Sequence, residues 1–126
     1  MQGDRPVNLD LTKFSFPLAA LASITHRVSG VVLFVGLAFM LYAADRALAS
    51  PSGFAEIQAL MAMPLAKFIT FGLLAALGYH LVAGIKHLFL DFHIGDSLRG
   101  GQIAAQIALV CAVVVIVLAG VWVYGY

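Results

Sequence analysis

The sequence predicts an all-α integral membrane protein with three transmembrane helices. Hydrophobic residues make up 63% of the chain and charged residues only 10%. A soluble domain is about one quarter charged, so this chain could not cover a water-exposed surface. Three apolar runs are each long enough to cross a bilayer, which takes about 20 residues. Backbone groups in lipid must be hydrogen-bonded inside the protein, so we expect each run to be a helix.

We expect a single transmembrane domain over residues 1–126, with short linkers between its spans. The predicted spans are residues 22–48, 64–90 and 102–124. The second span begins at Pro64, which suits a first helical turn because a proline there loses no hydrogen bond. The first linker, residues 49–63, contains a Ser-Pro-Ser-Gly sequence typical of a turn, and the second, residues 91–101, ends in Gly-Gly.

The positive charges predict how the chain crosses the membrane, because lysine and arginine concentrate on the inner side. Five of the seven cations lie before or at the start of the first span or around the second linker: Arg5, Lys13, Arg27, Lys86 and Arg99. We therefore expect the N-terminus inside and the C-terminus outside. An outer aromatic belt would then consist of Tyr42, Trp122, Tyr124 and Tyr126. Residues 1–16 lack an apolar core of signal-peptide length, so we expect the spans themselves to insert the chain.

His80 is the strongest candidate for a functional residue. An ionisable side chain inside a membrane span is costly unless something in the protein binds it. Gly72, Ala76, His80 and Gly84 recur every four residues and share one helix face. Small residues above and below the imidazole leave a flat gap that a haem would fill. The periodicity alone also allows a simpler role, in which His80 only hydrogen-bonds a neighbouring helix.

A polar group marks the inner end of the first span. Ser23 and Arg27 are four residues apart and point the same way, with His26 and Ser29 beside them. Each has a structural alternative. Arg27 alone could be an anchor that extends to the interface, Ser23 could bond its own helix, and His26 could be interfacial and solvated.

The second span carries two further polar residues on the face of His80. His87 follows it by seven residues and Asp91 by eleven. Seven helical residues rise about 10 Å, so His80 and His87 cannot bind one metal ion together. They could hold different ends of one large cofactor. A haem with its iron at His80 and its propionates directed towards Arg27 or His87 fits this spacing.

Two arguments predict a membrane partner. Only one histidine lies deep in the spans, so a haem with two histidine ligands would need the second from another chain. An internal pair of His80 and Met40 is a weaker alternative. Three helices also form a thin bundle that could hardly enclose a haem. The single cysteine rules out an intrachain disulfide and, without a C-x-x-C-H sequence, covalent haem attachment; we expect Cys111 to be buried apolar filler.

At these residues the chain resembles a known family. Ser23 to Gly30 (SITHRVSG) is similar to the pattern S-x-x-H-R-x-S/T-G, and Tyr79 to Phe92 (YHLVAGIKHLFLDF) to H-x-x-x-G-x-[RK]-H-x-x-x-D. Arg5 to Leu11 (RPVNLDL) resembles the N-terminal motif of the bacterial members. These patterns belong to the cytochrome b membrane-anchor subunits of succinate:quinone oxidoreductase. The family often has arginine where this chain has Lys86.

The resemblance implies a set of roles. His80 would be one axial ligand of haem b, and a second, smaller anchor subunit would supply the other. Ser23 and Arg27 would line the ubiquinone site, close to an iron–sulfur subunit on the inner face. His26, Arg27 and His87 would lie near the haem propionates. Succinate would be oxidised on a partner flavoprotein that carries FAD, and the whole complex would sit in a bacterial inner membrane.

Alternative functions remain open from the sequence. The chain could anchor a related fumarate reductase, because the direction of electron flow depends on the quinone and the partner subunits. It could instead be a haem-free scaffold, or a transporter subunit that uses His80 as a proton relay. A relay usually needs a second deep carboxylate or histidine, and the spans contain none. The Ser23–Arg27 pair and the small face around His80 favour haem and quinone.

Overall fold

The computed structural model describes residues 17–125, which form four helices and no strand. In chain order they are α1 (Leu18–Ala49), α2 (Pro51–Ala62), α3 (Pro64–Asp91) and α4 (Leu98–Tyr124). The prediction of an all-α chain with three membrane-spanning helices is confirmed, because α1, α3 and α4 are each long and apolar enough to cross a bilayer. The motif from Arg5 to Leu11, the cation Lys13 and the aromatic Tyr126 lie outside the described residues.

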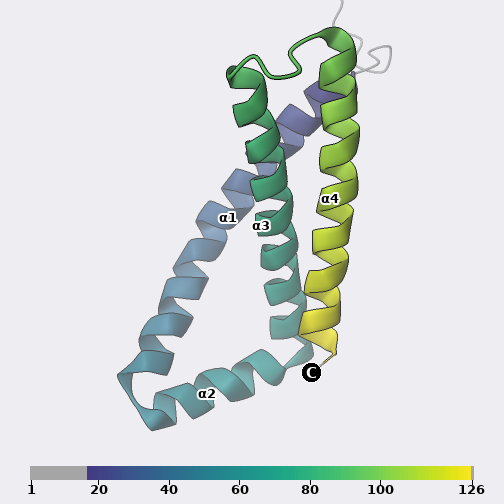
Figure 1. Cartoon of the computed structure of the whole chain (residues 1–126). Helices are drawn as coiled ribbons and strands as arrows, with labels where there is room; N and C mark the ends of the chain where they lie inside the picture. The colour runs from purple at the N-terminus through teal and green to yellow at the C-terminus, as the bar shows by residue number, and fades with distance from the viewer. Residues whose placement is uncertain (1–16, 126) are drawn as a thin grey trace, which may run out of the picture.

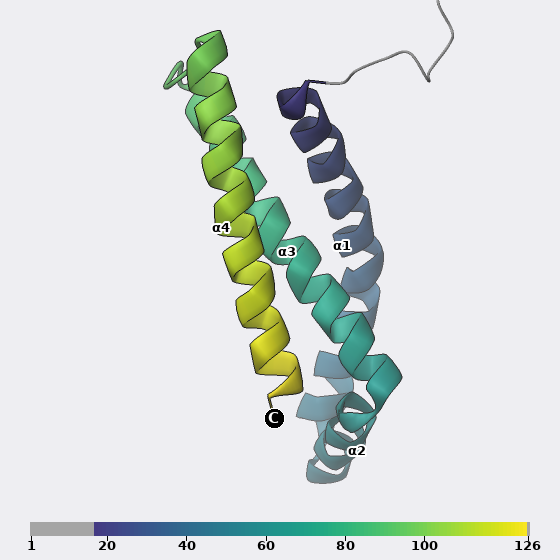
Figure 2. The ribbon, with the colours of Figure 1, turned by 90° about the vertical axis from the view of Figure 1, so that its right-hand side faces the viewer.

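The three long helices form a thin, open bundle. α3 lies between α1 and α4 in both views, and it packs along most of the length of α4 (Figures 1 and 2). α1 meets α3 near the N-terminal end of α1 and then diverges from it (Figure 1). The buried apolar residues of the described range are nearly all small: Ala43, Ala66, Ala83, Ala105, Ala112 and Val123. Most of the large apolar side chains face outward, as lipid-facing residues do.

The first linker contains a helix, where the sequence predicts a turn. α2 starts directly after Ser50, whose side chain accepts a hydrogen bond from the Gly53 amide at 3.0 Å. Pro51 occupies the first turn. Serine followed by proline marks helix starts as well as turns, so the expected Ser-Pro-Ser-Gly turn is instead a capped helix start. An ion pair from Arg46 to Glu56, 2.7 Å long, joins the end of α1 to α2, and Figure 1 shows α2 bridging the diverging ends of α1 and α3.

The second linker is shorter than expected. α4 begins at Leu98, not at residue 102, because Ser97 caps it and accepts a hydrogen bond from the Gly100 amide at 3.0 Å. The turn before it contains two residues with positive φ, His93 at 60° and Gly95 at 75°. The antiparallel course of α1 and α3 brings the N-terminal end of α1 beside the C-terminal end of α3. The candidate site lies there.

The lone cysteine differs from its prediction. Cys111 is exposed on α4 and is not buried filler. Apolar character places a residue in lipid as readily as in a protein core, so composition alone could not decide between the two.

Candidate functional site

The site is built around two histidines that α1 and α3 bring face to face. The rings of His26 and His80 stack with centroids 4.0 Å apart and an interplanar angle of 16°. His87, two turns further along α3, lies with its ring centroid 5.3 Å from that of His26. The interpretation of His26 as a solvated interfacial residue is wrong. Its Nε2 atom is buried and has no hydrogen-bond partner among residues 17–125.

One nitrogen of His80 is held by α1. Its Nδ1 lies 2.9 Å from the hydroxyl oxygen of Ser29 and 3.2 Å from the carbonyl oxygen of His26. The Ser29 hydroxyl in turn donates to the same carbonyl at 2.7 Å. The other nitrogen, Nε2, makes no hydrogen bond within the described range. The sequence predicts that Ser29 belongs to the polar group at the start of the first span, but helical spacing alone does not predict its contact with His80.

Two glycines permit the close approach of the helices. A Cβ atom added at Gly30 would lie 3.2 Å from Cε1 of His80, and one added at Gly84 would lie 3.3 Å from Nε2 of His26. Both distances are shorter than ordinary van der Waals contact. In contrast, a Cβ at Gly72 would meet nothing within 4 Å. The face of α3 that carries small residues is therefore covered by α1 at Gly84 and open at Gly72.

The contact at Gly30 predicts that a larger side chain at this position lowers the stability of the protein. We expect Gly30→Val to separate α1 from α3, since the His80 ring is hydrogen-bonded and cannot move aside. Overpacking of this kind costs about 1–3 kcal/mol. The thermal midpoint of the purified protein should fall. Gly101→Val is the matched control, because a Cβ at Gly101 in α4 meets no atom within 4 Å. Equal midpoints for the two variants would contradict the contact.

Ser23 and Arg27 lie together near the N-terminal end of α1, as their spacing predicted. Arg27 Nη2 donates to the Ser23 oxygen at 3.4 Å, a long and weak hydrogen bond. Arg27 is exposed and Ser23 is half-buried. The guanidinium has five donors, so most of them stay available to another group. Neither side chain belongs to the His26–His80 stack, although both lie within one turn of His26.

A second polar contact joins the same two helices, one turn closer to the N-terminus of α1. The Tyr79 hydroxyl donates to the carbonyl oxygen of Ala22 at 3.2 Å and also hydrogen-bonds the Thr25 hydroxyl. This pair could not be predicted from the sequence, because helical spacing within α1 and α3 does not specify how the two helices cross. Lys86 lies close by and is 6% exposed, where α3 packs on α4. Asp91, the last residue of α3, is exposed.

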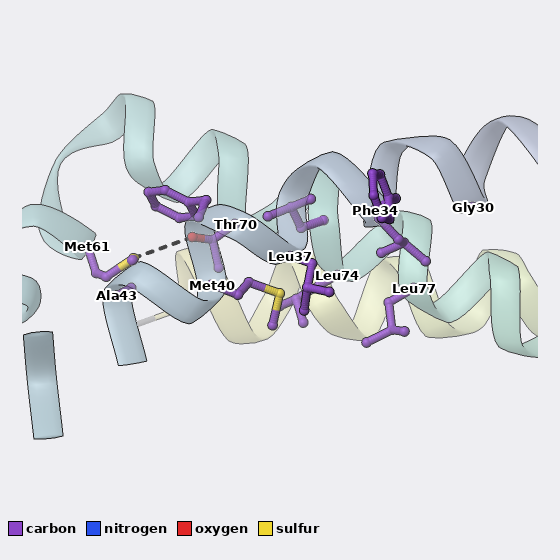
Figure 3. A pocket seen from close by; sticks show the side chains of 12 residues that line it. Gly30, Phe34, Leu37, Met40, Ala43, Met61, Thr70, Leu74 and Leu77 are labelled. Carbon is purple, nitrogen blue, oxygen red and sulfur yellow. Dashed lines mark hydrogen bonds between the residues drawn. The ribbon is translucent and has the colours of Figure 1, made fainter. Parts of the chain in front are cut away.

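An apolar cavity of about 590 Å³ opens where α1 and α3 diverge (Figure 3). It runs from Gly30, beside His80, to Met61 of α2, which accepts a hydrogen bond from Thr70 at 3.5 Å. Met40 lines its far part. Ten residues of α1 separate Met40 from Gly30, a rise of about 15 Å. The alternative pairing of His80 with Met40 on one iron ion is therefore wrong.

Comparison with known proteins agrees with these features. A family model described as the succinate dehydrogenase/fumarate reductase transmembrane subunit matches residues 1–119. The chain is 44% identical to the succinate dehydrogenase cytochrome b556 subunit of Coxiella burnetii over 98% of this chain and all of that protein. It is 33% identical to the subunit of the same name from Paracoccus denitrificans, over 93% of this chain and 90% of that one.

A third relative extends the comparison. The succinate dehydrogenase cytochrome b556 subunit of Rickettsia typhi is 29% identical over 90% of this chain and 89% of its own. The matches cover nearly the full length of each protein, and three apolar helices long enough to span a membrane agree with a transmembrane family. This chain belongs to the succinate dehydrogenase/fumarate reductase transmembrane subunit family.

Proposed function

We propose that this chain is the cytochrome b anchor subunit of a bacterial succinate dehydrogenase, that His80 binds a haem b iron, and that Ser23 and Arg27 form part of the ubiquinone site. The observation that carries the proposal is the environment of His80. Its Nδ1 is occupied by α1, while its Nε2 makes no hydrogen bond within residues 17–125. The relatives' name, cytochrome b556 subunit, supports a b-type haem in the complex.

The residues around His80 fit an axial haem ligand. Histidines that bind a metal almost always donate their second ring N–H to a carbonyl, a carboxylate or water, which fixes the ring. At His80 the His26 carbonyl and the Ser29 hydroxyl occupy that position. A bound haem would supply a site that accepts and releases one electron at a time. The chain's contribution is to orient the imidazole and to exclude water from it.

Under this proposal, a second histidine that would hold the haem would come from another chain. His26 cannot serve, because its ring is stacked parallel on His80 and cannot face it across an iron ion. His87 lies two turns away on the same helix as His80, and His93 lies in the exposed turn after α3. A second anchor subunit that supplies a histidine is the partner this arrangement requires. The open face of α3 at Gly72 leaves room for such a partner.

Three side chains that can donate hydrogen bonds, one arginine and two histidines, would lie on the inner side of His80. Arg27 has unused guanidinium donors, which form a planar fork suited to carboxylates. His26 has a buried Nε2 without a partner in residues 17–125, and His87 lies next to it. We assign these three side chains to the haem propionates, because each could donate a hydrogen bond to a carboxylate.

Ser23 and Arg27 could also stabilise a quinone during its reduction. Reduction places negative charge on a quinone oxygen, and a donor aimed at that oxygen lowers the barrier. The Ser23 oxygen accepts its hydrogen bond from Arg27, so its own hydrogen stays free to be donated. The exposed Arg27 guanidinium adds a permanent positive charge. Protons from water at the membrane surface can reach both groups.

The proposed orientation places this site on the inner side of the membrane. The N-terminus would lie inside, so the inner end of α1 would face a soluble iron–sulfur subunit. Electrons from succinate would start on a flavoprotein and pass through that subunit. Residues 17–125 of this chain contain no group of three or more His, Cys, Asp or Glu side chains that could hold a metal ion by themselves.

Purification through a tag on this chain tests the proposal. We expect a flavoprotein, an iron–sulfur protein and a second membrane anchor to co-purify, and the complex to reduce ubiquinone analogues with succinate. A pyridine haemochrome assay should find b-type haem. A complex without haem would favour the scaffold alternative, and purification of the chain with none of these partners would refute the proposed role.

A further inference from the structure

We infer that Ser29 is a positioning residue for His80. Its hydroxyl oxygen accepts a hydrogen bond from Nδ1–H of His80, fixes the tautomer and rotation of that ring, and thereby sets the reduction potential of the haem. The inference rests on the proposed function of His80 as a haem ligand and assigns to a second residue the control of that ligand.

The hydrogen atoms in this cluster can be assigned. A carbonyl oxygen only accepts, so in the 2.7 Å contact between Ser29 and the His26 carbonyl the hydroxyl is the donor. A serine hydroxyl has one hydrogen. Once that hydrogen points to the carbonyl, only lone pairs of the Ser29 oxygen remain for the Nδ1 atom of His80, which lies 2.9 Å away.

The tautomer of His80 follows from this assignment. Nδ1 faces two acceptors, the Ser29 oxygen at 2.9 Å and the His26 carbonyl oxygen at 3.2 Å. If Nδ1 carried a lone pair, it would face two other acceptors and no hydrogen bond could form. If Nδ1 carries a hydrogen, it can donate to both oxygens. Nδ1 therefore carries the hydrogen. In the neutral imidazole the lone pair then lies on Nε2, the atom that a haem iron needs.

The contact is shielded from its surroundings. Ser29 is 7% exposed and sits within the membrane-spanning part of α1. The His26 ring covers one face of His80 at 4.0 Å, and Gly30 stands against its Cε1. Stacking on His26 holds the plane of the His80 ring, but it does not distinguish between the two ring orientations that a ring flip would exchange. The two hydrogen bonds from Nδ1 select one orientation, and Ser29 accepts the shorter of them.

The electronic effect has a definite sign. An acceptor at Nδ1–H draws the hydrogen away and makes the imidazole a stronger electron donor at Nε2. Stronger donation stabilises ferric over ferrous iron, so the hydrogen bond lowers the reduction potential. Removing the Ser29 oxygen should therefore raise it. The His26 carbonyl would still accept from Nδ1, so the haem should stay bound.

The test compares Ser29→Val with Ser29→Thr in the intact complex. These side chains have the same shape and differ only by a methyl group in place of the hydroxyl. We expect Ser29→Val to keep the haem but to raise its midpoint potential in a redox titration, with shifted low-spin signals in electron paramagnetic resonance. Ser29→Thr should match the wild type. Ser29→Ala, which adds no bulk, should shift the potential in the same direction as Ser29→Val.

The matched control is Thr25→Val. Thr25 also bridges α1 to α3, through the Tyr79 hydroxyl, but it does not touch His80. Its removal should leave the potential unchanged. Equal potentials in the Val and Thr variants of Ser29, or loss of haem from both, would overturn the inference. If the Val and Thr variants of Ser29 have the same midpoint potential while His80→Ala loses its haem, only this inference fails. If His80→Ala keeps its haem, the proposed function fails.

Discussion

Replacing His80 with alanine should remove or strongly alter the b-type haem absorption of the purified complex. The Nε2 atom of His80 makes no hydrogen bond within residues 17–125, and its Nδ1 is already held by Ser29 and the His26 carbonyl. Without an axial nitrogen, a low-spin haem with two histidine ligands cannot form. The measurement is the difference spectrum of reduced minus oxidised complex, with haem quantified per flavin.

His93→Ala is the control for this variant. His93 is a histidine of the same chain, but it lies in the exposed turn after α3 and pairs with Asp96 at 3.1 Å. Its loss should leave the haem spectrum unchanged. An unaltered spectrum in His80→Ala would reject His80 as the ligand. Under the proposed function ubiquinone reduction need not stop in His80→Ala, because electrons could reach the quinone from the proposed iron–sulfur subunit without passing through the haem.

Replacing Arg27 with alanine should lower the rate of ubiquinone reduction by about 100-fold, the loss that follows removal of one donor to a developing oxyanion. Succinate oxidation measured with an artificial dye should stay near the wild-type rate, because under the proposed function that reaction would take place on the partner subunits. The measurement is the ratio of the two activities in the same preparation, which corrects for differences in the amount of complex.

Two further variants sharpen the test of Arg27. Arg27→Lys keeps the charge but lacks the planar fork of donors, so its rate should fall between those of the wild type and Arg27→Ala. Arg46→Ala removes an arginine at the other end of α1, where it pairs with Glu56, and should change neither activity. If Arg27→Ala reduces ubiquinone at the wild-type rate, Arg27 does not belong to the quinone site.

The sequence was sufficient for features that depend on one helix at a time. Composition and the length of the apolar runs predict the all-α membrane fold, and the four-residue spacing of Ser23 and Arg27 predicts their contact. His80 stands out because an ionisable side chain in an apolar span is energetically costly unless the protein or a ligand binds it. None of these inferences requires knowledge of how two helices cross.

Features that depend on the crossing of helices could not be predicted. The stack of His26 on His80 and the contact of Ser29 with Nδ1 arise because α1 meets α3 at Gly30 and Gly84. Periodicity gives the face on which a residue lies but not the residue that it faces on another helix. α2 was missed for a different reason, since Ser50 followed by proline is compatible with both a turn and a helix start.

An experimental map of the complete complex around His80 tests the central claim most directly. We predict density for a haem whose iron is bound to Nε2 of His80, with Nδ1 turned towards Ser29 and a histidine of a second anchor subunit on the opposite side of the iron. A map in which the His80 ring touches only protein, with the haem absent or bound elsewhere, would contradict this account.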